Sequence, residues 1–328
     1  GIASRGLGDV YKRQYLFMLA GERNVDLLFE AAVAGGIPLI RVLRESLLGE
    51  PVEKIMGIVN GTTNYILSQM EKSNNQFKEV LKKAQKLGYA EPGNPKLDLN
   101  GYDAFAKVRI LSALAFNNKI SKKKCLMEGI ENISLKDVEI SNKLNFRIKL
   151  LGISEIVGGK LFERVHPCLV NKDSYIGNVN GVMNAVITEG EPVGESVLQG
   201  EGAGPGPTSS ALMSDLLSIL RGNIKFPFGI PNIKRKSIKV FNYDNYINSL
   251  YLRFEVKDKP GVLAQITNRL ALKNISVERL IQIPNYKNKT ASIVIITHKS
   301  KELDAQHCIN AISKSKNILK YPTLIRLL

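Results

Sequence analysis

The sequence predicts a mixed α/β and α+β fold that ends in a small ferredoxin-like unit. Three observations lead to this prediction. Helix-like and strand-like segments alternate as far as about residue 220. A stretch rich in Pro, Lys and Asn at 222–248 then indicates a linker. Beyond it, 250–328 follows the order strand, helix, strand, strand, helix, strand, which is the ferredoxin-like arrangement.

The elements of the first two thirds follow from hydrophobic periodicity and from helix start and stop signals. Gly88 is well placed as the residue that ends a helix in a left-handed turn. A glycine-dense loop at 200–206 leads into a helix that Thr208, Ser209 or Ser210 would cap. β-rich segments fill the region up to about residue 190. The patterns predict a helix over 21–36, a strand or helix start over 37–47, a strand over 52–59, and helices over 60–73, 77–87 and 102–116.

Length and composition limit the classes of protein to which the chain can belong. The chain has 328 residues, 44% of them hydrophobic, which suffices for two or three cores. No apolar run approaches the length that spans a bilayer, so no membrane partner is expected. The formal net charge is +16, but the lysines are scattered without interleaved aromatic residues, which favours a solvated basic surface over nucleic-acid binding. Three unpatterned cysteines fit a reducing cytoplasm and argue against a disulfide framework or a zinc site.

The first 14 residues contain glycines that superficially suggest a phosphate-binding loop. Such a loop needs a preceding strand, a following helix and a third glycine, but Tyr11 stands where that glycine would follow Gly6 and Gly8. Residues 9–14 instead match the translation of GAT-GTG-TAT-AAG-AGA-CAG, which resembles the transposon end used to build sequencing libraries. Residues 1–14 are therefore predicted to be a non-native, adapter-derived segment.

The stretch at 88–107 concentrates the charges most useful for chemistry. Glu91 and Asp98 lie in a loop before a predicted helix, and Asp103 and Lys107 are four residues apart on that helix, so they share a face. Spacing alone favours a structural ion pair near a helix N-terminus. The two additional carboxylates favour a site that holds a substrate ammonium group through charge-assisted hydrogen bonds.

Three other motifs allow both a functional and a structural interpretation. Gly35 and Gly36 break a helix and leave carbonyls that, with Glu30, would suit a hard monovalent cation; a plain helix terminus is the alternative. The segment 60–66 offers hydroxyls beside a helix N-terminus, either as a pocket wall or as a capping motif. His166 lies in a β segment, where a lone histidine is expected to be a structural residue.

Together these motifs resemble the homoserine dehydrogenase family. The blocks "VAGGIPLI", "GIVNGTTNYIL" and "GEGAGPGPTSSALMSD" occur in the family's order, and the resemblance covers 15–328. The spacer between Glu91 and Asp98 is one residue longer than the common form, with Asn94 near a usual Asp. The residues that match the family signature are Ala84, Gly88, Tyr89, Glu91, Pro95, Leu97, Asp98, Gly101, Asp103 and Lys107.

The resemblance implies reduction of L-aspartate 4-semialdehyde to L-homoserine with NADPH or NADH, a cytoplasmic step toward threonine, methionine and isoleucine. Lys107 would donate a proton to the carbonyl oxygen. By the same resemblance, Glu91, Asp98 and Asp103 would bind the substrate; Gly88 and Gly202 would approach the cofactor; and the main-chain oxygens of Glu30, Val33, Gly35 and Ile37 would hold a sodium-like ion.

The resemblance also implies a domain organisation. It comprises a C-terminal remnant of a Rossmann-type nucleotide-binding domain at 15–45, an α+β catalytic domain with a mixed sheet at 46–199, a helix returning to the nucleotide-binding domain at 200–226, a linker at 227–248 and an ACT regulatory domain at 249–328. Because the glycine-rich cofactor loop would precede residue 15, the chain by itself is expected to lack dehydrogenase activity.

The C-terminal segment "EVKDKPGVLAQI" resembles the strand, loop and helix at which ACT domains bind an amino acid, with Gly261 beside the ligand. Threonine is the effector that the resemblance suggests, and a dimerisation module without a ligand is the alternative. The family resemblance also implies a homodimer or higher homo-oligomer. A rival interpretation makes the chain an amino-acid-binding regulatory protein without catalytic turnover.

Overall fold

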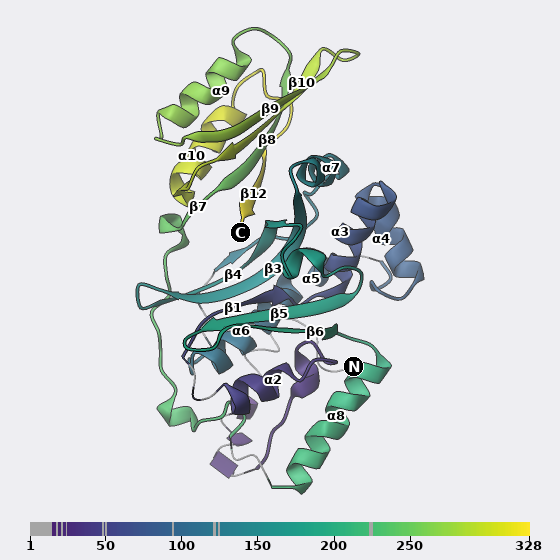
Figure 1. The fold of residues 1–328 in the computed structure, drawn as a ribbon, viewed down its shortest axis with the longest axis vertical. Coiled ribbons are helices and arrows are strands. Elements are labelled where there is room, and N and C mark those ends of the chain that lie inside the picture. Colours follow the sequence, from purple (N-terminus) through teal and green to yellow (C-terminus); the bar gives the residue numbers. More distant parts are fainter. Residues whose placement is uncertain are drawn as a thin grey trace.

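The computed structural model describes residues 15–328 apart from 18, 21, 24, 48, 50, 94, 121, 122, 124 and 223–225, so the predicted adapter segment lies outside the described residues. Its strands are β1 Val52–Ile58, β2 Leu126–Met127, β3 Phe146–Val157, β4 Lys160–Asn171, β5 Met183–Gly190, β6 Gly194–Glu201, β7 Ile247–Asn248, β8 Leu250–Lys257, β9 Val277–Asn285, β10 Thr290–Thr297, β11 Ser300–Lys301 and β12 Thr323–Leu327. Ten of these described strands form one mixed sheet in the order β6-β5-β1-β3-β4-β12-β8-β10-β9, with β2 beside β4. The mixed α/β fold predicted from the sequence is confirmed (Figure 1).

The helices fall into three groups around this sheet (Figure 1). In the central unit, here defined as 46–199, they are α3 Gly61–Ser73, α4 Phe77–Lys86, α5 Lys96–Leu99, α6 Tyr102–Ala115 and α7 Leu135–Lys143. The C-terminal unit, 249–328, carries α9 Val262–Ala271 and α10 Glu302–Ser313. At the opposite end of the molecule lie α2 Leu39–Arg41, continued by a π-helical turn over Val42–Ser46, and α8 Pro205–Leu220.

Close packing of α6 on the sheet fixes the helix that carries the predicted catalytic lysine. Helix α6 contacts β1, β3 and β4. A Cβ atom on Gly152 of β3 would lie 2.1 Å from a methyl carbon of Val108, so only glycine lets the helix approach this closely. Because Val108 follows Lys107 directly, this contact also fixes the place of the lysine against the end of β1.

Two local predictions are wrong. The helix predicted over 21–36 does not run through the segment: residues 22 and 23 are helical, but 25–29 has no helical conformation and the 3₁₀ turn Glu30–Ala32 follows. The segment is instead bonded to the end of β6, through the amides of Gly35 and Gly36. Helix α8 begins at Pro205 with Gly204 as its N-cap, so the hydroxyl cap predicted three to five residues later is not used.

The C-terminal unit has the predicted strand and helix order and its own apolar core. The strands β8, β9, β10 and β12 carry α9 and α10 on one side (Figure 1). The sequence did not predict that β12 also pairs in parallel with β4, with Arg326 opposite Cys168 and Leu327 opposite Leu169. The two units therefore share a continuous sheet, while the predicted linker runs along the central unit, where the Leu161 amide donates to the Lys239 carbonyl.

Candidate active site

The predicted site residues meet where β1 ends and α3 begins, and Asn60 joins them. The Asn60 side-chain oxygen accepts from the Thr63 amide at 2.9 Å, which caps α3. Its Nδ2 group donates to Asp98 Oδ1 at 2.8 Å and to Asp103 Oδ2 at 2.9 Å. The capping interpretation of 60–66 is confirmed, and the same asparagine holds two carboxylates together. This role could not be predicted from the sequence, where its only signal is an amide residue directly after a predicted strand.

Two oxygen atoms of this cluster hold the Lys107 ammonium group. Its Nζ atom lies 2.8 Å from Asp103 Oδ2, as the spacing on α6 predicted, and 2.9 Å from the Val59 carbonyl oxygen. The side chains of Lys107 and Asp103 are only 17% and 8% exposed. A lysine ammonium group has three donors, so these two partners leave one N–H for a bound molecule.

Asp98 and Asp103 place two carboxylates against a single lysine. Asp98 lies in the short helix α5, partly buried. Burial raises the pKa of Asp98, and the charges of Asp103 and Glu91 add to this increase. The Asn60 hydrogen bond and the Lys107 charge oppose the shift, but the pKa stays above its ordinary value. A bound cationic group would relieve this excess of negative charge. The arrangement therefore suits a ligand that carries an ammonium group.

The loop between α4 and α5 contributes exposed groups to the same region. Glu91 is exposed, and its effect on the pKa of Asp98 shows that it lies within electrostatic reach of that carboxylate. Gly88 has the predicted left-handed conformation, with φ of 76°, and no atom lies within 4 Å of the position that a Cβ would take. The backbone at Gly88 is thus open to the approach of a ligand.

Gly202 and the predicted cation segment form a second group of residues, at the end of β6. A Cβ on Gly202 would lie 2.0 Å from Asn184 Nδ2, so any side chain there would have to displace the Asn184 amide. The Gly35 amide donates to the Gly202 carbonyl at 2.9 Å, and the Gly36 amide donates to the Glu201 carbonyl at 2.9 Å. The structure thereby brings the predicted cofactor glycine next to part of the predicted cation segment.

Glu30 uses its side chain for a structural purpose. Its carboxylate accepts from the amides of Ile40 and Arg41 at the start of α2. Burial raises the pKa of Glu30 to about 7, and the nearby Asp215 carboxylate adds to the shift. A cation at this segment would therefore depend on main-chain oxygens, of which that of Ile37 already accepts from the Leu39 amide. Within the described part of the chain, no cluster of His, Cys, Asp and Glu could hold a metal ion.

The remaining predicted residues lie apart from this cluster. His166 is 2% exposed and its Nδ1 atom lies 3.0 Å from the Pro167 carbonyl oxygen. Burial and the Arg326 and Arg164 charges lower its pKa well below the ordinary value, which agrees with a neutral structural histidine. Gly261, with φ of 85°, begins α9 in the C-terminal unit and lines a cavity of about 440 Å³. Among the described helices, none is long and apolar enough to cross a membrane.

Comparison with known proteins agrees with this geometry. The family model described as homoserine dehydrogenase matches 38–217, and that of the ACT domain matches 250–316. Homoserine dehydrogenase of Neisseria gonorrhoeae is 41% identical over 318 residues, which cover 95% of this chain and 73% of that protein. The crystal structure of a homoserine dehydrogenase from Thiobacillus denitrificans aligns with a TM-score of 0.89 at 36% identity, covering 97% of this chain and 74% of that one. A hyperthermophilic archaeal homoserine dehydrogenase mutant in complex with NADPH aligns with a TM-score of 0.57 at 28% identity, over 68% of this chain and 64% of that one.

Proposed function

The chain belongs to the homoserine dehydrogenase family, and from this premise we propose that the Asn60 cluster is its substrate site. The reaction interconverts L-homoserine and L-aspartate 4-semialdehyde with NAD(P), at a CH–OH group. The observation that carries the proposal is the position of Lys107, bonded to Asp103 and the Val59 carbonyl and left with one free donor direction. The alternative of a regulatory protein without turnover offers no reason for this arrangement.

Lys107 has the chemistry that reduction of an aldehyde requires. When bound, the nicotinamide cofactor supplies a hydride to the aldehyde carbon. Negative charge then develops on the carbonyl oxygen, and the Lys107 ammonium group stabilises this charge and donates the proton that completes the hydroxyl group. In the reverse direction the neutral amine accepts the hydroxyl proton. Asp103 and the Val59 carbonyl hold the lysine in one orientation for both directions.

The carboxylates supply the other half of the site. Asp98 and Asp103, joined by Asn60, would bind the substrate ammonium group, with Glu91 contributing from the exposed loop. An ammonium group carries three donors, which matches a site with more than one carboxylate. Binding would also remove the cost of placing the Asp98 and Asp103 charges close together.

Gly88 and Gly202 are the residues that would approach the cofactor. The backbone at Gly88 is open, and at Gly202 the Asn184 amide lies where a side chain would begin, so both positions fit a close backbone approach. Regions 15–45 and 200–226 would belong to a nucleotide-binding unit. Two facts support this assignment, since the Glu30 amide donates to Asp215 of α8, and apolar side chains are exposed along the same helix. These exposed residues are Leu212, Met213, Leu216, Leu217, Ile219 and Leu220.

A monovalent cation such as sodium would bind main-chain oxygens of the segment beside Gly202. The proposed oxygens are those of Glu30, Val33, Gly35 and Ile37. In the C-terminal unit, an amino-acid effector such as threonine would bind beside Gly261, which supplies an open left-handed turn at the edge of a cavity. We place the protein in the cytoplasm, in keeping with its three unpaired cysteines. Its family resemblance suggests a homodimer or higher homo-oligomer.

Replacing Lys107 by Ala tests the proposed function. In the complete product of the gene that carries this sequence, we expect homoserine-dependent reduction of NAD(P) to fall by about 10² to 10⁴ in kcat, because a positioned proton donor contributes on this order. Lys54→Ala is the matched control. Lys54 lies outside the site, and its Nζ atom pairs with Glu189 at a distance of 2.7 Å. Retention of most activity in Lys107→Ala would contradict the role of the lysine.

A calorimetric titration with threonine tests the regulatory alternative. Turnover of homoserine by the wild-type protein supports the enzyme whether or not threonine binds. Threonine binding without any turnover by the complete gene product would instead favour a regulatory protein.

A further inference from the structure

We propose that Glu128 and Arg326 are positioning residues through which the C-terminal unit fixes the place of Asp98 in the substrate site. The inference rests on the proposed function, because it treats Asp98 as a substrate-binding group. The contacts that carry it run from β12 of the C-terminal unit, through the loop after β2, to α5 and the Asn60 cluster.

The path begins with Arg326, whose guanidinium group joins both units. Its Nη1 and Nη2 atoms donate to the two oxygens of Glu128 at 2.8 and 3.0 Å, in a bidentate contact with the central unit. Its Nε and Nη2 atoms also donate to Glu302 of α10 at 3.1 and 2.6 Å. The Arg326 side chain is 1% exposed, so both contacts are shielded from solvent on the arginine side.

The main chain next to Glu128 lies directly on α5. The Glu128 amide donates to the Val165 carbonyl of β4 at 2.8 Å, and the Ile130 amide donates to the Leu99 carbonyl at 2.9 Å. Between them, Gly129 touches α5 so closely that a Cβ would lie 1.9 Å from the Leu99 carbonyl oxygen. Because the main chain of 128–130 packs directly on α5, a displacement of this main chain would move the end of α5.

Helix α5 connects the segment 128–130 to the proposed substrate site, because it carries Asp98. Leu99 follows Asp98 directly, and the turn after α5 leads through Gly101 into α6. A Cβ on Gly101 would lie 3.1 Å from a Val165 methyl carbon and 3.4 Å from the Glu128 carbonyl oxygen. The Asn60 contact with Asp98 therefore depends on where the segment 128–130 holds α5.

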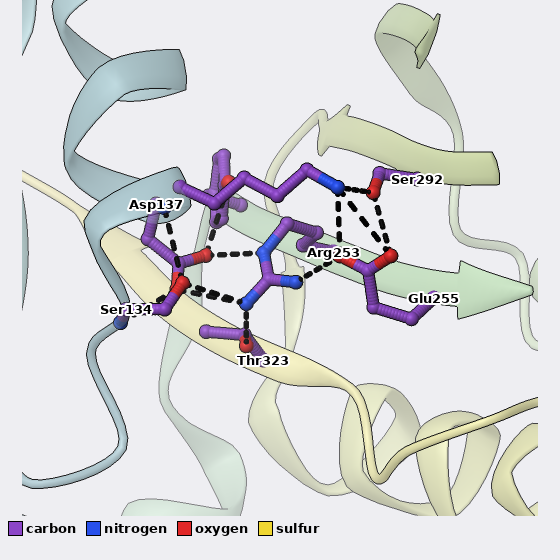
Figure 2. A network of polar contacts seen from close by, with 8 residues as sticks. Ser134, Asp137, Arg253, Glu255, Ser292 and Thr323 are labelled. Atoms are coloured by element: carbon purple, nitrogen blue, oxygen red, sulfur yellow. Dashed lines mark hydrogen bonds and ion pairs between the residues drawn. The ribbon is translucent and has the colours of Figure 1, made fainter. Parts of the chain in front are cut away.

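A second cross-unit cluster provides a natural comparison (Figure 2). Arg253 of β8 donates to Asp137 of α7 at 2.6 and 2.9 Å, and Glu255 pairs with both Arg253 and Lys136 of α7. Lys136 and Asp137 therefore face the C-terminal unit, and α7 packs on β3 and α3 rather than on α5. Glu128 of the first cluster and Lys136, Arg253 and Glu255 of the second line the cavity of about 1040 Å³ between the units. Of the two clusters, that of Glu128 adjoins α5.

The experiment compares Glu128→Gln with Glu255→Gln in the complete gene product. Each change removes one charge of a cross-unit ion pair and leaves the buried arginine a second carboxylate, Glu302 or Asp137 respectively. We expect Glu128→Gln to raise the KM for homoserine roughly threefold to thirtyfold with kcat within about twofold, the range for coupling through packed networks. We expect Glu255→Gln to leave both constants unchanged. Equal KM values in the two variants would overturn the proposal.

Amide hydrogen exchange supplies a second measurement that does not depend on turnover. We expect Glu128→Gln to speed exchange at the amides of 98–101 and of Ile130, which are bonded within α5 or to it, and Glu255→Gln to leave them unchanged. Unaltered exchange at these amides in Glu128→Gln would also overturn the proposal. A wild-type protein without turnover would instead count against the proposed function, and the exchange comparison would still decide the role of Glu128.

Discussion

The proposed substrate site and the junction between the two units both bury charged groups, but they balance those charges differently. At the junction, burial alone would raise the pKa of Glu302, yet the Arg326 guanidinium brings that pKa below its ordinary value. In the site, burial and neighbouring carboxylates raise the pKa of Asp98. Paired charges stabilise the junction, whereas the unpaired excess in the site is a cost that a cationic ligand can remove.

This difference separates residues that hold the fold from residues that bind. A substitution at the junction should lower the free energy of unfolding, whether or not it also displaces Asp98 as proposed for Glu128. A substitution in the proposed site should weaken binding while leaving that free energy nearly unchanged.

Replacing Arg326 by Met should have the largest effect on stability. The change leaves the Glu302 carboxylate, whose side chain is 0% exposed, buried without its charge partner. We expect the free energy of unfolding, measured by urea denaturation, to fall by about 3–5 kcal/mol. Lys54→Met is the control, because its pair with Glu189 is more exposed and should contribute about 0–1 kcal/mol. Equal losses in the two variants would show that the junction is not a special source of stability.

Replacing Asp98 by Asn should reverse this pattern. The substitution removes one charge from the proposed ammonium site, and we expect the KM for homoserine to rise about tenfold to a hundredfold, since a hydrogen bond to a charged group contributes about 1.5–3 kcal/mol. The free energy of unfolding should change by less than about 1 kcal/mol, because losing a poorly compensated charge offsets the lost hydrogen bond.

Asp137→Asn is the matched control for this variant, since Asp137 is a fully buried carboxylate at the junction. It should lower the free energy of unfolding and leave the KM for homoserine unchanged. A stability loss in Asp98→Asn as large as that in Asp137→Asn would mean that Asp98 is a structural group.

The parts that could be predicted from the sequence depend on short-range patterns. The pairing of Asp103 with Lys107 follows from their spacing on one helix, and the strands and helices of the C-terminal unit follow from alternation and turn residues. Contacts between distant segments could not be predicted in this way. The Asn60 bridge and the parallel pairing of β12 with β4 depend on how whole elements pack. The absence of a helix over 21–36 has the same origin, because tertiary bonds to β6 override local propensity.

Lys149 offers the finest test, because it is a buried cation that contacts neutral oxygens. Its Nζ atom donates to Asn64 Oδ1 at 3.1 Å, to the Val179 carbonyl at 2.5 Å and to Asn180 Oδ1 at 3.2 Å. Burial lowers its pKa to about 8, and the nearby Arg147 charge adds to the shift. Like the substrate site, this position therefore carries a charge that the fold compensates only in part.

The lowered pKa fixes the sign of the pH dependence. Between about pH 8 and pH 10.5 the unfolded chain keeps the Lys149 proton and the folded protein releases it, so the free energy of unfolding should rise with pH. From pH 8 to pH 9.5 this contribution should reach about 1–2 kcal/mol, measured by urea denaturation as the difference in slope between the wild-type protein and Lys149→Met. Parallel pH profiles for the two proteins would show that the three oxygen atoms compensate the charge fully. In that case, three neutral oxygen atoms would stabilise the buried Lys149 charge as well as a carboxylate does, and the lack of a carboxylate partner would not by itself indicate a destabilised charge.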